Sequence, residues 1–339
     1  MIKGHGDDYA GELEANFSSN VWYGAENAAL YAHLFNTLPK TTRYPEADAA
    51  SLKIILAGKK NLKSSQITVC NGSTEAFYLI ANAYSESVSL IVSPTFSEYA
   101  DACAMYQHRV YHTSRQKLIE NIEKLRPNLV WICNPNNPDG FCYSAKELKD
   151  LIVKFPLSIF IIDQAYIDFT LSNPLELNEM NGVENLILVQ SLTKRHGIPG
   201  LRLGYLISNE SIIKQIQHFC IPWSVNTLAI EAGKFLLENE SDEFPISDWL
   251  LEAALLQQKI NAIDFLETYP SQTPYFLVEL QKGKAIDLKA FLLKDKILIR
   301  DATNFVDLNG EHIRICTLSA KKNELLINKL KEWSRFITR

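Results

Sequence analysis

The sequence lacks the features that mark membrane, secreted or nucleic-acid-binding proteins. No stretch approaches the roughly 20 apolar residues that a membrane-spanning helix needs, and the first residues contain no apolar run like that of a signal peptide. The net charge of −5 provides no excess of positive charge for nucleic acid or an anionic membrane. We therefore expect a cytoplasmic protein that acts on a small molecule, with neither nucleic acid nor membrane as partner.

Paired cysteines are also missing. The six cysteines are scattered and include no CxxC pair, so we expect reduced thiols, no disulfide framework and no metal site. No internal repeat or long linker interrupts the chain. With 339 residues, 47% of them hydrophobic, the sequence is typical of a globular protein with two subdomains.

Short apolar runs alternate with amphipathic stretches in the centre of the chain. Helices are predicted at about 74–84, from about 95 to 104, and from Ser144, a candidate N-cap. This alternation favours an α/β fold with a mainly parallel sheet covered by helices. Ligands bind beyond the carboxyl ends of the strands in such sheets. The runs predicted to be strands are 66–69, 90–92, 129–132, 159–162 and 186–189.

The pattern changes after about residue 225, where a smaller α+β unit is predicted. We divide the chain into an N-terminal arm with part of the small domain (1–45), a large domain (46–230) and a C-terminal small domain (231–339). The elements predicted for the last part are a long helical region at about 226–267, strands at 275–278, 297–299 and 312–316, and a final helix at about 320–336.

The segment Ser191-Leu192-Thr193-Lys194, with Arg202 eight residues further on, is the most informative functional signal. A lysine amine forms a Schiff base with the aldehyde of pyridoxal phosphate, while hydroxyl groups and a guanidinium hold the phosphate of this cofactor. The segment is suggestive by itself, because most lysines are solvated surface groups.

Other polar residues follow the predicted strands. Asp163 ends one of them, where it would either pair with a protonated pyridinium nitrogen or cap a turn. Asn137 lies in a turn rich in proline and asparagine, and with Tyr166 it would contact the phenolate oxygen of the cofactor. The turn chemistry explains the composition of that segment equally well.

Two further segments allow both a functional and a structural interpretation. Ser73 and Thr74 stand between a strand and a helix, where they would bind the cofactor phosphate or cap the helix. Phe96 would stack on the pyridine ring, although core packing is the commoner fate of such a residue, and Tyr99 is an alternative for stacking.

The order of these segments resembles a known family. NGSTEAF, SPTFSEY, NPNNPDG, IIDQAYIDF and SLTKRHGIPGLRLGY are similar to motifs of the pyridoxal-phosphate-dependent aminotransferases of fold type I, and most similar to the histidinol-phosphate aminotransferase branch. The resemblance extends from RYPEAD near residue 43 to HIRICTL near residue 312. It implies a mainly parallel, seven-stranded-type sheet in a large domain, with a smaller α+β domain.

The resemblance also implies roles for single residues. Lys194 would be the Schiff-base lysine, Asp163 the partner of the ring nitrogen, and Asn137 and Tyr166 the ligands of the phenolate, with Phe96 stacked on the ring. The phosphate would be held by Ser73, Thr74, Ser191, Thr193 and Arg202.

Two other roles concern the partner subunit and the substrate. Tyr44, in the Arg-Tyr-Pro-Glu motif, would reach the cofactor phosphate of the neighbouring subunit, which implies a homodimer with shared sites. Arg314 and Arg300 would bind anionic groups of the substrate. The sequence does not tell which anion each arginine takes.

Four residues depart from the family pattern. Gln164 replaces a common acidic residue, Asp139 replaces the more frequent threonine, and Arg195-His196 replaces an aromatic pair. None of these changes removes a catalytic group. Arg195 and His196 are expected to add positive potential beside the site and to influence the choice of substrate.

The same resemblance leaves two reactions open. The start of the chain, with His5 and Asn20 as expected substrate ligands, resembles threonine-phosphate decarboxylases, as do Thr193 and residues 297–305. The favoured reaction is therefore decarboxylation of L-threonine O-3-phosphate for cobalamin biosynthesis. Transamination, with Lys194 as general base, is the alternative, either of histidinol phosphate or by another class I or II aminotransferase activity. For His5, an N-terminus without a function is an equally good interpretation. A ligand-sensing domain without catalysis is a third, less favoured possibility.

Overall fold

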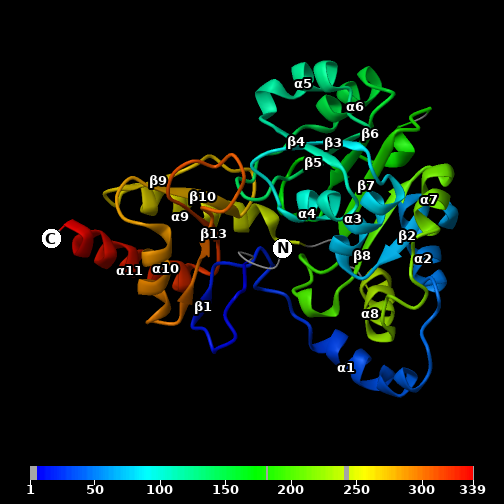
Figure 1. Cartoon of the computed structure of the whole chain (residues 1–339). Helices are drawn as coiled ribbons and strands as arrows, with labels where there is room; N and C mark the ends of the chain where they lie inside the picture. Colours follow the sequence, from blue (N-terminus) through cyan, green and yellow to red (C-terminus); the bar gives the residue numbers. More distant parts are fainter. Residues whose placement is uncertain (1–5, 181, 240–243, 339) are drawn as a thin grey trace.

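The computed structural model describes residues 6–180, 182–239 and 244–338, and Figure 1 shows a large α/β unit beside a smaller one. The main sheet has the strand order β2-β8-β7-β6-β5-β3-β4. Only β8 runs antiparallel to its neighbours within the described part of this sheet, so the sheet is mainly parallel, as predicted. Its strands are β2 (Ile67–Cys70), β3 (Val88–Val92), β4 (Arg109–Thr113), β5 (Leu129–Cys133), β6 (Ile159–Asp163), β7 (Leu186–Ser191) and β8 (Gly204–Ser208).

Helices cover both faces of this sheet, which explains its continuous apolar strands. In β6, Phe160 and Ile162 belong to one apolar cluster, whereas Ile161 belongs to another on the opposite face. α6 begins as expected: the N–H of Glu147 donates to the Ser144 hydroxyl, and the Glu147 carboxylate accepts from the N–H of Ser144. The helices are α2 (Ala50–Lys60), α3 (Gly72–Ala83), α4 (Glu98–Met105), α5 (Leu118–Leu125), α6 (Ala145–Lys154), α7 (Glu210–Gln217) and α8 (Thr227–Glu238).

The smaller unit contains an antiparallel sheet with the order β12-β13-β10-β9 and a separate parallel pair, β1 with β11. In Figure 1 it occupies one side of the molecule and is coloured yellow to red, apart from β1, which is blue. Its elements are β1 (Ala15–Asn16), β9 (Leu266–Thr268), β10 (Tyr275–Leu280), β11 (Ile297–Leu298), β12 (Arg300–Asp301), β13 (His312–Cys316), α9 (Ile246–Asn261), α10 (Ala285–Leu293) and α11 (Ala320–Thr338).

The helical region expected at 226–267 is divided between the two units. α8 packs on α1 (Ala28–Thr37) and α2, whereas α9 packs on α11 and β9. Pro245 stands at the N-cap of α9, where its fixed φ angle and missing N–H favour a helix start over a helix interior. Short 3-10 helices complete the described structure: Leu38–Thr42, Ser64–Gln66, Arg115–Lys117, Ile167–Phe169, Leu177–Glu179 and Pro199–Leu201.

The N-terminal part of the chain contacts both units. The N–H of Phe17 donates to the carbonyl of Leu298, and the N–H of Cys316 donates to the carbonyl of Phe17, so this segment is attached to the smaller unit. α1 then crosses to the large unit and packs on α8 (Figure 1). Among the described residues, no helix has the length and apolar character that a membrane crossing requires.

Candidate active site

Residues that follow separate strands of the main sheet line one pocket. Most of the polar ones come from the ends of β2, β5, β6 and β7, where a mainly parallel sheet places its ligands, whereas Arg202 stands just before β8. Of the residues that the sequence assigns to the cofactor, only Tyr44 is absent from the lining. The lining consists of Gly72, Ser73, Thr74, Phe96, Cys133, Asn137, Asp163, Ala165, Tyr166, Ser191, Thr193, Lys194 and Arg202.

Lys194 presents a buried amine to this pocket. Burial lowers the pKa of Lys194 to about 8, and the positive charges of Arg202 and Arg314 act in the same direction, against the opposing charge of Asp163. Its Nζ lies 5.8 Å from the centre of the Tyr166 ring. A lysine with this pKa has a substantial unprotonated fraction near neutral pH and can act as a nucleophile.

Asp163 lies at the end of β6 and is 4% exposed. Its Oδ1 accepts the N–H of Ala165 at 2.9 Å, and its Oδ2 accepts the hydroxyl of Tyr99 at 2.5 Å. Burial raises the pKa of Asp163, whereas these hydrogen bonds, first that of Tyr99, and the charge of Lys194 lower it. Tyr99 does not line the pocket, so Phe96 remains the ring available for stacking.

An anion cradle forms where α3 begins. Gly72 has φ +80°, and a Cβ at this position would lie 2.5 Å from Nη2 of Arg202, so glycine lets the guanidinium approach the helix start. The hydroxyls of Ser191 and Thr193 lie 2.9 Å apart on the same side of the pocket. N–H groups at a helix start, hydroxyl groups and an arginine together suit a phosphate.

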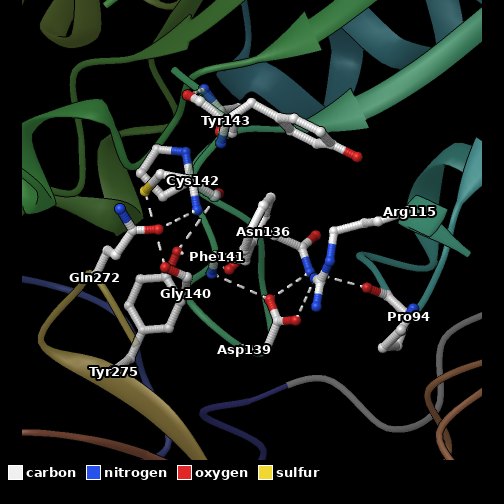
Figure 2. A network of polar contacts seen from close by, with 12 residues as sticks. Pro94, Arg115, Asn136, Asp139, Gly140, Phe141, Cys142, Tyr143, Gln272 and Tyr275 are labelled. Atoms are coloured by element: carbon white, nitrogen blue, oxygen red, sulfur yellow. Dashed lines mark hydrogen bonds and ion pairs between the residues drawn. The ribbon is translucent and has the colours of Figure 1, made fainter. Parts of the chain in front are cut away.

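The turn that carries Asn137 is tied to the large unit by an ion pair (Figure 2). The amide of Asn136 donates to the carbonyl of Pro94 at 2.9 Å and to Oδ1 of Asp139 at 2.7 Å. Nη1 of Arg115 lies 2.5 Å from Oδ2 of Asp139. The departure at Asp139 is therefore explained by its structural role: its carboxylate fixes this turn.

The same turn is also bonded to the smaller unit, through the segment before β10 (Figure 2). The hydroxyl of Tyr275 donates to the carbonyl of Asn136 at 3.1 Å. The N–H of Gln272 donates to the carbonyl of Gly140 at 3.1 Å, and the Gln272 side chain accepts the N–H of Cys142 at 2.9 Å. The turn is thus a junction between the two units, directly beside the pocket.

Arg300 and Arg314 face each other across β12 and β13. Arg314 donates to Oδ1 of Asn137 at 2.5 Å and to the carbonyl of Ser18, while Arg300 donates to Oδ1 of Asn304 at 2.6 Å. Burial lowers the pKa of both arginines, that of Arg300 to about 10, with the charge of Arg314 as a further cause. Two neighbouring buried cations favour the binding of an anion.

These arginines line a second pocket that shares Phe96 and Asn137 with the first. The two pockets are therefore neighbours. His112, which is in an edge strand, was not predicted, and Asn304 was included only as part of the segment 297–305, without a role of its own. The second pocket is lined by Gly6, Ile91, Ser93, Thr95, Phe96, Ser97, Ala100, Asp101, His112, Asn137, Arg300, Asn304, Phe305, Val306 and Arg314.

Several residues expected at the site lie elsewhere. Tyr44 is 84% exposed, with its ring 5.4 Å from that of Trp223, and it does not reach the pocket of its own chain. Asn20 is buried, and its amide has no hydrogen-bond partner among the described residues, but it lines neither pocket. His5 lies outside the described residues.

Arg195 and His196 also lie outside both pockets. The guanidinium of Arg195 is 3.7 Å from the carboxylate of Asp168 and 5.1 Å from the centre of the Phe244 ring. The carbonyl of His196 accepts a hydrogen bond from the side chain of Asn27. Neither residue lines either pocket, so no direct contact supports their expected influence on the choice of substrate.

Comparisons with known proteins show the family of the chain. Residues 8–330 match the family described as aminotransferase class I and II. The sequence is 31% identical over 328 residues to the threonine-phosphate decarboxylase of Salmonella typhimurium, covering 93% of this chain and 90% of that protein. It is also 31% identical over 299 residues to the histidinol-phosphate aminotransferase of a Thermoanaerobacter species, covering 85% and 84%. The crystal structure of L-threonine-O-3-phosphate decarboxylase from Porphyromonas gingivalis matches with a TM-score of 0.92 and 38% identity, covering 95% of this chain and 99% of that one.

Proposed function

Because the chain belongs to the class I and II aminotransferases, whose members are pyridoxal-phosphate-dependent enzymes, we propose that it is a cytoplasmic decarboxylase of L-threonine O-3-phosphate. The products would be CO2 and (R)-1-aminopropan-2-ol phosphate, which supplies the side chain that links the nucleotide loop of cobalamin. The observation that carries this proposal is the pair of adjacent pockets, with Lys194 in one and both Arg300 and Arg314 in the other. A phosphorylated amino acid fits such a site because it needs an amine-reactive end and an anion-binding end.

The residues of the first pocket suit pyridoxal phosphate in three ways. The missing Cβ of Gly72 lets the Arg202 guanidinium stand at the start of α3, where a phosphate would bind. Asp163 is a buried acid suited to a cationic ring nitrogen, and Lys194 has a reactive amine. When bound, the cofactor supplies an electron-accepting ring for the reaction. The proposed ligands are Ser73, Thr74, Ser191, Thr193 and Arg202 for the phosphate, Asn137 and Tyr166 for the phenolate, Asp163 for the ring nitrogen and Phe96 for the ring face.

The arginine pair would decide which bond of the substrate breaks. If the arginines held the phosphate of the substrate, its carboxylate would be left free to depart as CO2. Lys194, whose pKa is about 8, would then return a proton to Cα. If the arginines held a carboxylate instead, that group would be retained, and Lys194 would remove the Cα hydrogen as a proton, as transamination requires.

Transamination of histidinol phosphate with 2-oxoglutarate is the second candidate function. It is favoured by the identity of 31% to a histidinol-phosphate aminotransferase, which equals the identity to the threonine-phosphate decarboxylase. Both substrates carry one phosphate and one amine, so the described pockets suit either of them.

Product analysis by mass spectrometry separates the two functions. The protein, purified and loaded with pyridoxal phosphate, is given L-threonine O-3-phosphate in one reaction, and histidinol phosphate with 2-oxoglutarate in another. Aminopropanol phosphate in the first reaction without glutamate in the second is the expected result. Glutamate alone would establish an aminotransferase. Lys194→Ala is the control, and it should form neither product.

The proposed enzyme is a homodimer in which Tyr44 of each subunit completes the phosphate site of the other. The support is the exposure of Tyr44 beside Trp223, which is itself 52% exposed. Ile221, in the same loop as Trp223, is also exposed. Contiguous exposed apolar side chains of this kind are typical of a protein–protein interface.

A further inference from the structure

Asp163 receives two hydrogen bonds from different parts of the chain. The N–H of Ala165 reaches Oδ1 at 2.9 Å, and this is a local contact that any residue with a backbone N–H can make. The hydroxyl of Tyr99, on α4, reaches Oδ2 at 2.5 Å. The second bond therefore depends on the identity of one distant side chain.

Aromatic rings fix the position of Tyr99. Its ring stacks on Trp131 with centroids 5.7 Å apart and an interplanar angle of 21°, and it meets Phe77 and Phe96 edge-on at 4.8 Å and 5.9 Å. The side chain is 1% exposed. Burial and then the charge of Asp163 raise the pKa of Tyr99 well above its usual value, so the hydroxyl keeps its proton and remains a donor.

The ionised form of Asp163 is the form that can pair with a protonated ring nitrogen. Burial opposes this form because it raises the pKa of Asp163, and the hydrogen bond from Tyr99 is the first of the contacts that lower it. A donor to a carboxylate in a water-excluded site stabilises the anion and fixes its orientation. A protonated, neutral Asp163 would no longer attract a cationic ring.

We propose that Tyr99 is a positioning residue of this enzyme, whose hydroxyl holds Asp163 ionised and correctly oriented. Through Asp163 it sets how strongly the cofactor ring withdraws electrons. The inference rests on the proposed use of pyridoxal phosphate and adds a residue that touches neither the cofactor pocket nor the substrate pocket.

The test is Tyr99→Phe in the cofactor-loaded protein, because this change removes one oxygen and retains the ring that packs on Trp131. The kcat should fall about tenfold to a hundredfold, the usual effect of losing a hydrogen bond to a charged group, with KM changed less than about threefold. The pH dependence of the cofactor's absorption should shift as well. Tyr78→Phe is the matched control, since the Tyr78 hydroxyl donates to the carboxylate of Glu98 at 2.9 Å outside both pockets. It should leave kcat and the absorption spectrum unchanged.

A cofactor analogue with carbon in place of the ring nitrogen separates this role from simple packing. Asp163 has no ring nitrogen to pair with in that complex, so the wild type and Tyr99→Phe should give equal absorption spectra and equal single-turnover rates. The inference would be overturned if Tyr99→Phe, like Tyr78→Phe, left kcat and the absorption spectrum unchanged. It would also be overturned if Tyr99→Phe lowered the single-turnover rate as much with the analogue as with pyridoxal phosphate. A wild-type protein that develops no cofactor absorption band would overturn the proposed function as well.

Discussion

The amine of Lys194 has a pKa of about 8 because it is buried beside two arginines. Only the unprotonated amine can attack an aldehyde, so the rate at which the cofactor-free protein captures pyridoxal phosphate should depend on this pKa. We expect the rate to rise about tenfold per pH unit below pH 8 and to level off above it. Stopped-flow absorbance from pH 6 to 10 measures this rate. A rate that still rises steeply between pH 9 and 10 would show that the amine has the pKa of an ordinary lysine.

Gly72 is the residue on which the phosphate cradle depends most directly. Gly72→Ala would place a Cβ against Arg202 at a backbone conformation that favours glycine, so the affinity for pyridoxal phosphate should fall at least about tenfold. Fluorescence titration of the cofactor-free protein measures the affinity. Gly58→Ala is the control, because no atom lies within 4 Å of a Cβ there, in the last turn of α2. That change should leave the affinity unaltered and raise the free energy of unfolding by no more than about 0.5–1 kcal/mol, the effect in the middle of a helix.

Single residues of the candidate site were predictable where they end a strand. Asp163 follows a continuous apolar run, and Lys194 follows another, so topology alone brings them to one edge of the sheet. The hydrogen bond from Tyr99 was not predictable. Phe96 and Tyr99 both lie near the start of α4, and the sequence does not tell which ring faces the pocket and which hydroxyl faces the acid.

Among the structural elements, the turn at residues 134–140 connects the two units, and its composition does not indicate this role. The sequence predicts a turn there, but its anchors, Arg115 and Gln272, come from distant parts of the chain. β8 was likewise not predicted, because a five-residue strand that begins with glycine has little pattern of its own. Its position depends on long-range antiparallel pairing with β2 and β7.

The ion pair of Asp139 and Arg115 should therefore stabilise the protein and hold the Asn137 turn. Asp139→Asn should lower the free energy of unfolding by about 1–3 kcal/mol, because it leaves the Arg115 guanidinium without its carboxylate partner. Urea unfolding of the cofactor-free protein measures this change. Asp150→Asn breaks an exposed pair with Lys146 and should cost no more than about 0.5 kcal/mol. Equal effects of the two changes would argue against an anchoring role for Asp139.

At the scale of the whole molecule, the proposed sharing of sites predicts complementation between two defective proteins. Tyr44→Ala should bind pyridoxal phosphate weakly, and Lys194→Ala should be inactive. In a mixed dimer, one site combines the intact Lys194 of one chain with the intact Tyr44 of the other. Equal mixtures, unfolded and refolded together, should recover about a quarter of the wild-type sites, because half of the dimers are mixed and each has one complete site. The recovery is measured as enzyme activity at limiting cofactor. A refolded mixture whose activity does not exceed the average activity of the two variants refolded separately would exclude a shared site.

The substrate end of the site joins early and late parts of the chain. Arg314 on β13 bonds to Ser18 and Asn137, and β1 pairs with β11, which is synthesised long after it. Synthesis on the ribosome proceeds from the N-terminus, so a nascent chain can form the Lys194 pocket well before the arginine pair has emerged. The reactive amine is therefore present during translation without a complete substrate site, and turnover must wait until β13 has left the ribosome.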